Sequence, residues 1–246
     1  MKKSELIIAV LTLLILWQLA AMIINKPILP TPYVVGQTLV QEVIDGQILD
    51  HFFASLWRVV VSTLLAIIIA APIGLVLGQS KRLHKFISPI VYLLYPIPKV
   101  VFVPIILLFF GIGDFPKIMI IFLILFFQVL VLVRDQAAGI RPELIQSVRS
   151  LGAGRRALFR FVYFPASLPA ILTALRQSVG TAVAVLFIAE LIATQKGLGY
   201  YIYFNGSTLF NYPAMYAGIV ALSIMGLGLY YFVDWFEHQV CAWQYL

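Results

Sequence analysis

The sequence contains few charged residues for its length. Of its 246 residues only 11% are Asp, Glu, Lys or Arg, whereas 62% are hydrophobic and the mean hydropathy is +1.01. A soluble globular protein of this size needs much more polar surface than this composition provides. The scarcity of charge therefore excludes a soluble domain and predicts an integral membrane protein.

Cysteine and histidine are also scarce. The single cysteine, Cys241, has no second cysteine with which to form an intrachain disulfide. The three histidines, His51, His84 and His238, are far apart and show no spacing typical of metal ligands. We therefore expect no disulfide, no metal site and no bound cofactor.

Catalytic and nucleotide-binding motifs are missing. The chain has no Gly-x-x-x-x-Gly-Lys-Ser/Thr loop, so it cannot hold the phosphates of ATP in that way. The His-Glu-x-x-His and Gly-x-Ser-x-Gly motifs are absent too, and Glu190 is the only acidic residue well inside an expected membrane span. We expect that the chain is not an enzyme and that energy for any transport comes from a separate protein.

What the sequence does contain is a series of apolar runs, each close to or above the length of about 18 residues that marks a transmembrane helix. The six runs cover approximately residues 6–24, 56–78, 87–110, 117–133, 168–193 and 212–232. The first run is longer than the apolar part of a signal peptide, about 7–15 residues, so we expect it to remain as a membrane helix. The runs predict an all-α integral membrane protein with six transmembrane helices.

The net charge of +7 is explained by topology. Lys and Arg gather in the loops that would face the cytoplasm, as the positive-inside rule predicts. This pattern places both termini in the cytoplasm and residues 26–55 outside, where residues 33–44 have the spacing of an amphipathic helix. The charge therefore does not indicate nucleic-acid binding, and the expected surroundings are the lipids of the cytoplasmic (inner) membrane.

The third apolar run cannot form one straight helix. It contains four prolines and a lysine, namely Pro89, Pro96, Pro98, Lys99 and Pro104. Each proline removes a backbone donor that hydrocarbon cannot replace, so a broken helix must be buried in protein or line a cavity. We favour a wall of a transport pathway, and a kinked packing helix is the alternative.

Further polar side chains within the runs are candidates for lining such a pathway. The full set of candidates is Arg58, Pro96, Pro98, Lys99, Gln128, Arg176 and Glu190. Charged side chains in a membrane are costly and commonly functional. The alternatives are that Gln128 holds two helices together, which we favour, and that Arg176 and Glu190 anchor the ends of their helix.

The longest polar segment covers residues 134–169. It holds six arginines, Arg134, Arg141, Arg149, Arg155, Arg156 and Arg160, against the acids Asp135 and Glu143. Gly152 is expected to break the segment into two helices, and Pro165 and Pro169 to mark the return into the membrane. We predict a cytoplasmic helix-turn-helix that docks on a partner.

This segment resembles the "EAA" loop in the permease subunits of binding-protein-dependent ABC importers. The resemblance rests on the spacing of Gln146, Ser147, Val148, Gly152, Val162, Phe164 and Pro165, although Gln146-Ser147-Val148 replaces the Glu-Ala-Ala triplet and Phe164 replaces a leucine. Residues 149–153, and residues 189–193 with Gly197-Leu198-Gly199, are similar to the nitrate, sulfonate and taurine branch. The likeness begins near Leu29, so residues 1–28 are expected to form an N-terminal membrane helix and residues 29–246 the permease domain.

The resemblance implies a type I importer fold with defined partners. Two cytosolic ATPase subunits would bind the loop at Gln146, Ser147, Val148, Arg149, Leu151, Gly152, Ala153 and Arg155. It further implies a homodimer and an extracytoplasmic solute-binding protein. Similar permeases carry taurine, alkyl sulfonates, nitrate, bicarbonate or thiamine-pyrimidine precursors, and Arg58, Lys99 and Arg176 favour an anion. The rival hypotheses are an autonomous carrier or channel, which an internal inverted repeat and midplane charges would favour, and a membrane scaffold with straight, uniformly apolar spans.

Overall fold

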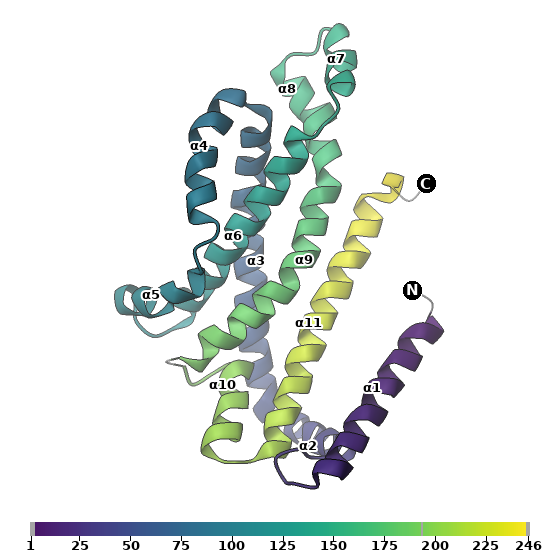
Figure 1. Cartoon of the computed structure of the whole chain (residues 1–246), viewed down its shortest axis with the longest axis vertical. Helices are drawn as coiled ribbons and strands as arrows, with labels where there is room; N and C mark the ends of the chain where they lie inside the picture. The colour runs from purple at the N-terminus through teal and green to yellow at the C-terminus, as the bar shows by residue number, and fades with distance from the viewer. Residues whose placement is uncertain (1–2, 193, 245–246) are drawn as a thin grey trace. The chain divides into compact units, whose positions relative to one another are not determined.

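The computed structural model describes residues 3–192 and 194–244, and the regular elements within these residues are helical. The α-helices are α1 (Lys3–Ile24), α2 (Pro32–Ile44), α3 (Gln47–Gln79), α4 (Lys81–Leu94), α5 (Val103–Phe110), α6 (Asp114–Ala138), α7 (Pro142–Ser150), α8 (Arg155–Leu158), α9 (Phe164–Leu191), α10 (Leu198–Tyr203) and α11 (Tyr212–Val240) (Figure 1). Short 3₁₀ or π segments are η1 (Lys99–Phe102), η2 (Phe159–Tyr163), η3 (Phe204–Thr208) and η4 (Ala242–Gln244). The expected all-α class is confirmed.

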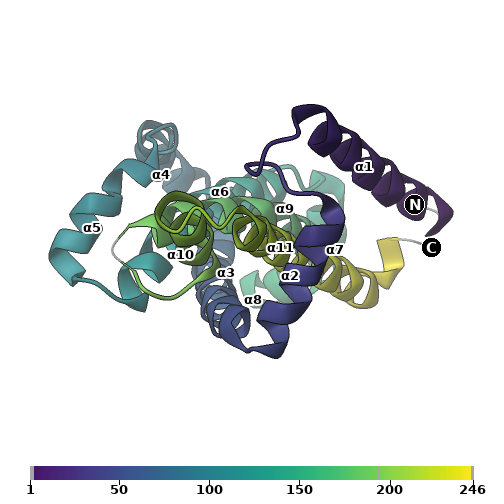
Figure 2. The same cartoon turned by 90° about the horizontal axis from the view of Figure 1, so that it is seen from below.

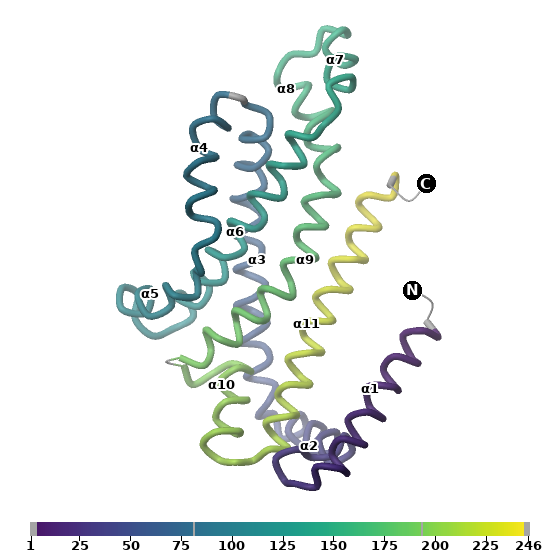
Figure 3. Tube along the Cα trace, in the orientation of Figure 1, coloured from purple at the N-terminus to yellow at the C-terminus, as the bar shows by residue number. Residues whose placement is uncertain are grey.

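The number of membrane spans agrees with the six apolar runs. Among the described residues five helical segments are long and apolar enough to cross a membrane, namely Ser4–Ile24, Gln47–Gln79, Asp114–Ala138, Arg155–Leu191 and Tyr212–Val240. A sixth span is obtained when α4 is taken together with η1 and α5, which are bent from it by 76° (Figure 3). The prediction that the third run is broken is therefore confirmed.

Several helices extend beyond the predicted runs. α3 begins at Gln47, before the expected start near Leu56, and α11 continues to Val240, beyond the expected end near Phe232. Pro165 and Pro169 do not separate a loop from a membrane helix, because α8, η2 and α9 follow one another without a break from Arg155 to Leu191. The helix therefore continues through both prolines, and neither of them marks a break between the second loop helix and the membrane helix.

The chain divides into two compact units. Unit 1 comprises Met1–Leu56 and Glu190–Met225, and unit 2 comprises Trp57–Ala189 and Gly226–Leu246. In unit 1, α1 and α2 run in different directions and are joined by a short connection (Figure 2). Trp17 Nε1 donates to Pro30 O at 3.1 Å and the Trp17 ring lies 5.7 Å from that of Tyr216, while most of α1 is exposed. Most of the apolar surface of α1 is therefore not covered by the described part of this chain.

α2 is the amphipathic helix that the spacing of residues 33–44 predicted. Thr31 caps its first turn by accepting from the N–H of Val34, and Pro32 occupies the first turn, where its missing N–H costs nothing. Val35 is buried, whereas Tyr33 and Ile44 are exposed. One face of α2 thus packs on unit 1 and the other remains open.

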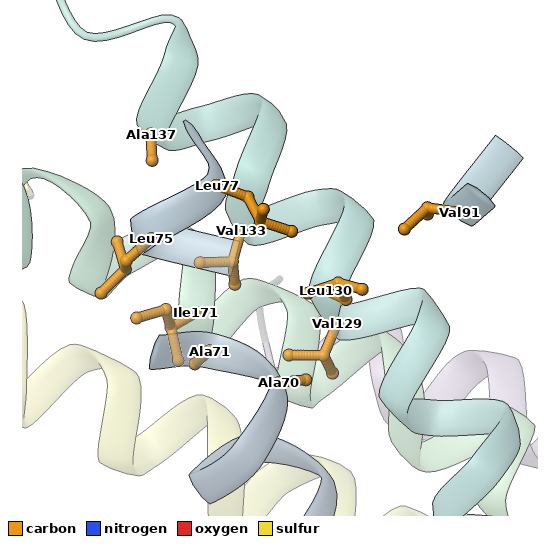
Figure 4. Packing of buried hydrophobic residues seen from close by; sticks show 10 residues of the cluster. All are labelled: Ala70, Ala71, Leu75, Leu77, Val91, Val129, Leu130, Val133, Ala137 and Ile171. Atoms are coloured by element: carbon orange, nitrogen blue, oxygen red, sulfur yellow. The ribbon is translucent and has the colours of Figure 1, made fainter. Parts of the chain in front are cut away.

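Unit 2 is held by close packing of α3 against α6. The core residues are Ala70, Ala71, Leu75, Leu77, Val91, Val129, Leu130, Val133, Ala137 and Ile171 (Figure 4). A Cβ added at Gly74 would lie 2.9 Å from Leu130 O, and one at Gly78 would lie 2.5 Å from Arg134 O. Only glycine permits this approach, so the Gly74-x-x-x-Gly78 spacing serves a contact within the chain.

Candidate functional site

The broken span contains one buried ammonium group. Lys99 begins the η1 turn, and its Nζ lies 3.0 Å from Leu94 O, 2.6 Å from Tyr95 O and 3.1 Å from Ile97 O. The same atom is 4.7 Å from the ring centroid of Phe127 on α6. The lysine therefore binds the backbone at the end of α4.

Lys99 and Gln128 line the same pocket. This pocket, of about 440 Å³, is bounded by Tyr95, Lys99, Ile124, Phe127, Gln128, Val131, Leu132 and Gln177. A neighbouring pocket of about 320 Å³ shares Leu132 and Gln177 with it and adds Gln136 and Thr173. Together the two pockets form a groove along α6 and α9, hereafter the α6–α9 groove. The structure thus brings two of the predicted pathway residues together and adds Gln136 and Gln177, which the sequence analysis missed.

Arg58 lies outside this groove. Its side chain is 4% exposed, and its Nη2 lies 2.6 Å from Asp114 Oδ1 at the first residue of α6. Because Asp114 is at a helix N-terminus, its carboxylate also faces the positive end of the helix dipole. The ion pair joins α3 to α6 and fits the role of an anchor.

Arg176 on α9 binds two acidic residues on α11. Its Nη1 lies 2.5 Å from Asp234 Oδ1 and 3.4 Å from Glu237 Oε2. Thr173 Oγ1, one turn earlier, donates to Glu237 Oε1 at 3.0 Å. No spacing in the sequence indicates these partners, since they are 58 residues or more away along the chain.

Glu190 belongs to a separate network within unit 1. Its buried carboxylate accepts from Ser55 Oγ at 2.8 Å and from the N–H of Gly199 at 2.8 Å. Ser55 Oγ accepts in turn from the N–H of Leu198 at 2.8 Å, and His51 Nδ1 accepts from the N–H of Gly197 at 3.0 Å.

Three consecutive N–H groups, of residues 197–199, are therefore bound by side chains from α3 and α9. These groups are the otherwise unsatisfied donors at the start of α10. Glu190 and the Gly197-Leu198-Gly199 segment are thus joined in one hydrogen-bond network. Gly199 and Gly206 lie in α10 and η3.

Arg134 does not lie in the polar loop where the sequence analysis placed it. We counted it among the loop arginines, but it lies within α6, where it is 1% exposed. Its Nη2 is 2.7 Å from Asp135 Oδ1, and the guanidinium lies 4.9 Å from the ring centroid of Tyr92 on α4. The polar segment therefore begins after Ala138, and Arg134 belongs to the packing of unit 2.

The expected break at Gly152 is present. α7 ends at Ser150, and Gly152 has φ +83°, a backbone conformation that residues with a side chain rarely adopt. None of the residues of α7 is buried, and Leu151 beside the glycine is 85% exposed. The proposed docking residues thus lie on an exposed surface of unit 2.

Comparisons with known proteins agree with this fold. A family model described as the inner membrane component of binding-protein-dependent transport systems matches residues 62–240. The taurine transport system permease protein TauC of Escherichia coli (strain K12) is 31% identical over 233 residues, covering 92% of this chain and 84% of that protein.

Solved structures show the same fold. A chain of the MetNI methionine ABC transporter, in inward-facing conformations, has a TM-score of 0.70 at 22% identity and covers 78% of this chain and 95% of that chain. A bacterial alginate ABC transporter, solved in complex with an alginate pentasaccharide-bound periplasmic protein, gives 0.59 at 19% identity and covers 97% of this chain and 96% of that chain. This chain therefore belongs to the family of binding-protein-dependent transport system inner membrane components and has the fold of an ABC importer permease.

Proposed function

We propose that this chain is the membrane-spanning subunit of an ABC importer that takes up a small sulfonate such as taurine. The observation that carries the proposal is the combination of an exposed helix–glycine–helix segment with a polar groove between membrane helices, in a chain of this family. ATP hydrolysis takes place in a separate subunit, and the chain itself catalyses no reaction.

The segment from α7 to α8 is the proposed contact with the ATPase. Two copies of a cytosolic ATPase bind Gln146, Ser147, Val148, Arg149, Leu151, Gly152, Ala153 and Arg155, one on each of two copies of this chain. Exposure of α7 and the left-handed turn at Gly152 support this role, because a docking helix must be free of its own chain. Movement of the ATPase subunits would reach the membrane helices through this segment.

The α6–α9 groove is the proposed wall of the pathway. Gln128, Gln136 and Gln177 provide hydrogen-bonding amides along it, and among the described residues no carboxylate lines either of its two pockets. Such a lining suits a sulfonate, which accepts hydrogen bonds and would be repelled by acidic side chains. Since the groove is open on one side, a second copy of this chain closes it in the proposed homodimer.

The remaining assignments follow from the charge pattern and the family. Both termini face the cytoplasm, residues 1–28 are an N-terminal membrane helix, and residues 29–246 form the permease domain. An external solute-binding protein delivers the solute to the side where α10 lies. The similarity to a taurine permease and to a transporter solved with its periplasmic protein supports these assignments.

Co-purification tests the proposal. The chain is expressed with its chromosomal neighbours and purified in mild detergent, and the proteins that accompany it are identified and counted. We expect a stoichiometric ATPase that carries a phosphate-binding Gly-x-x-x-x-Gly-Lys-Ser/Thr motif. A chain that purifies without an ATPase, yet moves solute in liposomes, would establish an autonomous carrier instead.

A further inference from the structure

The break between α4 and α5 leaves backbone carbonyls without their helical donors. In a continuous helix Leu94 O would accept from the N–H of residue 98, but Pro98 has none. Ile97 N reaches Leu94 O only at 3.3 Å, and the N–H of Val101 bonds to Pro98 O rather than to Ile97 O. Hydrocarbon cannot supply these donors, so another group must supply them.

The side chain of Lys99 supplies them. Its Nζ is within 3.1 Å of the carbonyl oxygens of Leu94, Tyr95 and Ile97. An ammonium group has three N–H donors, so these three carbonyls occupy all of them. Its positive charge also lies at the C-terminal end of α4, where the helix dipole is negative.

Aromatic rings complete the surroundings of this ammonium. Nζ lies 4.7 Å from the ring centroid of Phe127 and 5.5 Å from that of Tyr95, both within the range of cation–π attraction. Lys99 is buried, and none of the ion pairs found in residues 3–192 and 194–244 includes it. Its charge is thus balanced by carbonyl oxygens and rings, with no donor left for a solute.

We propose that Lys99 is an internal cap that fixes the bend between α4 and α5, and that it is a positioning residue with no direct contact to the solute. By holding the bend it keeps Tyr95 in the wall of the pocket opposite Gln128 and Gln177. Only the importance of that pocket rests on the proposed function. The cap itself rests on the hydrogen bonds of Lys99.

The bend can be measured with two spin labels. In a Cys241→Ser background, cysteines replace Phe86 on α4 and Leu108 on α5, which are 75% and 85% exposed. The labelled full chain is placed in lipid nanodiscs with excess unlabelled chain, and the distance distribution between the nitroxides is recorded. A straight helix would separate these positions by about 33 Å along its axis, at 1.5 Å per residue, and the bend brings them closer.

Lys99→Met removes the donors and preserves the apolar stem. We expect a broad distribution that extends to longer distances, while Gln128→Met, which removes a polar group from the same pocket, keeps the single short distance. A nitroxide distance distribution for Lys99→Met that is as narrow and as short as that of the parent chain would contradict the proposed role of Lys99 as a cap.

A second variant covers the case in which Lys99→Met does not accumulate in the membrane. Adding Pro98→Ala restores the N–H that Leu94 O would use in a continuous helix. We expect the double variant to regain membrane levels and to show longer nitroxide distances than the parent chain. Failure to recover would contradict the cap. Because neither readout needs ATPase or solute, the result stands independently of the proposed transport activity.

Discussion

The carboxylate of Glu190 fills the space beside Gly197 that a β-carbon would need. A Cβ built on Gly197 would overlap both Glu190 oxygens, and the glycine has φ +126°. Glu190 in turn accepts from Ser55 and from the N–H of Gly199. The acid and the glycine are therefore parts of one buried arrangement that ties the start of α10 to α3 and α9.

Gly197→Ala should destabilise the protein. The new methyl group would force Glu190 away from Ser55, and the backbone would remain in a conformation that costs about 1–3 kcal/mol for residues other than glycine. We expect a clear fall in the thermal unfolding midpoint in detergent. Gly228→Ala is the matched control, because no atom lies within 4 Å of its added Cβ. Equal midpoints for the two variants would show that the contact is unimportant.

Ser55→Ala should remove one hydrogen bond from each of two groups. The N–H of Leu198 would lose its acceptor, at a cost of about 1–3 kcal/mol for a buried group left unsatisfied, and Glu190 would lose one donor while keeping the N–H of Gly199. Glu190→Gln alone should also destabilise the protein. The double variant should lose less stability than the sum of the losses in the two single variants. Thermal unfolding of all four proteins measures this coupling. Strict additivity would mean that Ser55 and Glu190 act separately.

Arg176→Met should weaken the contact between α9 and α11. The substitution leaves Glu237, whose side chain is 3% exposed, without the cation that faces it. Breaking a buried ion pair on one side costs about 3–5 kcal/mol, and the partial exposure of Arg176 places this case at the lower end. Thermal unfolding should show the loss of stability. Adding Glu237→Gln to Arg176→Met should recover part of this loss. Arg156→Met, at an exposed arginine, should change the unfolding midpoint little. A stable Arg176→Met variant would refute the anchor role.

Gly152→Pro should separate ATP hydrolysis from transport. Proline cannot adopt φ +83°, so the turn between α7 and α8 would be distorted while the membrane helices remain intact. We expect normal membrane insertion but loss of solute-stimulated ATPase activity in the assembled transporter. Gly154→Ala, at a residue with φ −76°, is the control. Normal transport by Gly152→Pro would exclude this turn from the ATPase contact.

Cys241 should react slowly with thiol reagents. Burial, together with the nearby Glu237 carboxylate, raises the pKa of the Cys241 thiol, so less thiolate is present at neutral pH. Maleimide labelling of the folded protein should therefore be slow, should increase with pH, and should become fast after denaturation. Rapid labelling of the folded protein at neutral pH would contradict the buried position.

Sequence reasoning succeeded where the cause is local. The break in the third span follows from Pro96 and Pro98 themselves, and the turn after α7 follows from Gly152. It failed where the cause lies far away along the chain. Ser55 and Glu190 are 135 residues apart, and no spacing links them.

Two errors arose at the ends of elements. Arg134 looked like a loop residue because charges follow it, yet its guanidinium pairs with Asp135 and lies over the ring of Tyr92 inside the fold. Pro169 looked like a helix start, but it lies inside α9. Neighbouring structure can compensate for a proline within a membrane helix, and the sequence does not show such compensation.

ATP-driven uptake in proteoliposomes tests the central proposal most directly. The chain is reconstituted with its co-purified ATPase, and taurine uptake is measured with and without ATP and the solute-binding protein. We predict uptake only when the ATPase, ATP and the binding protein are all present. Uptake by the chain alone, without ATPase or ATP, would contradict an ABC importer and identify a self-sufficient carrier.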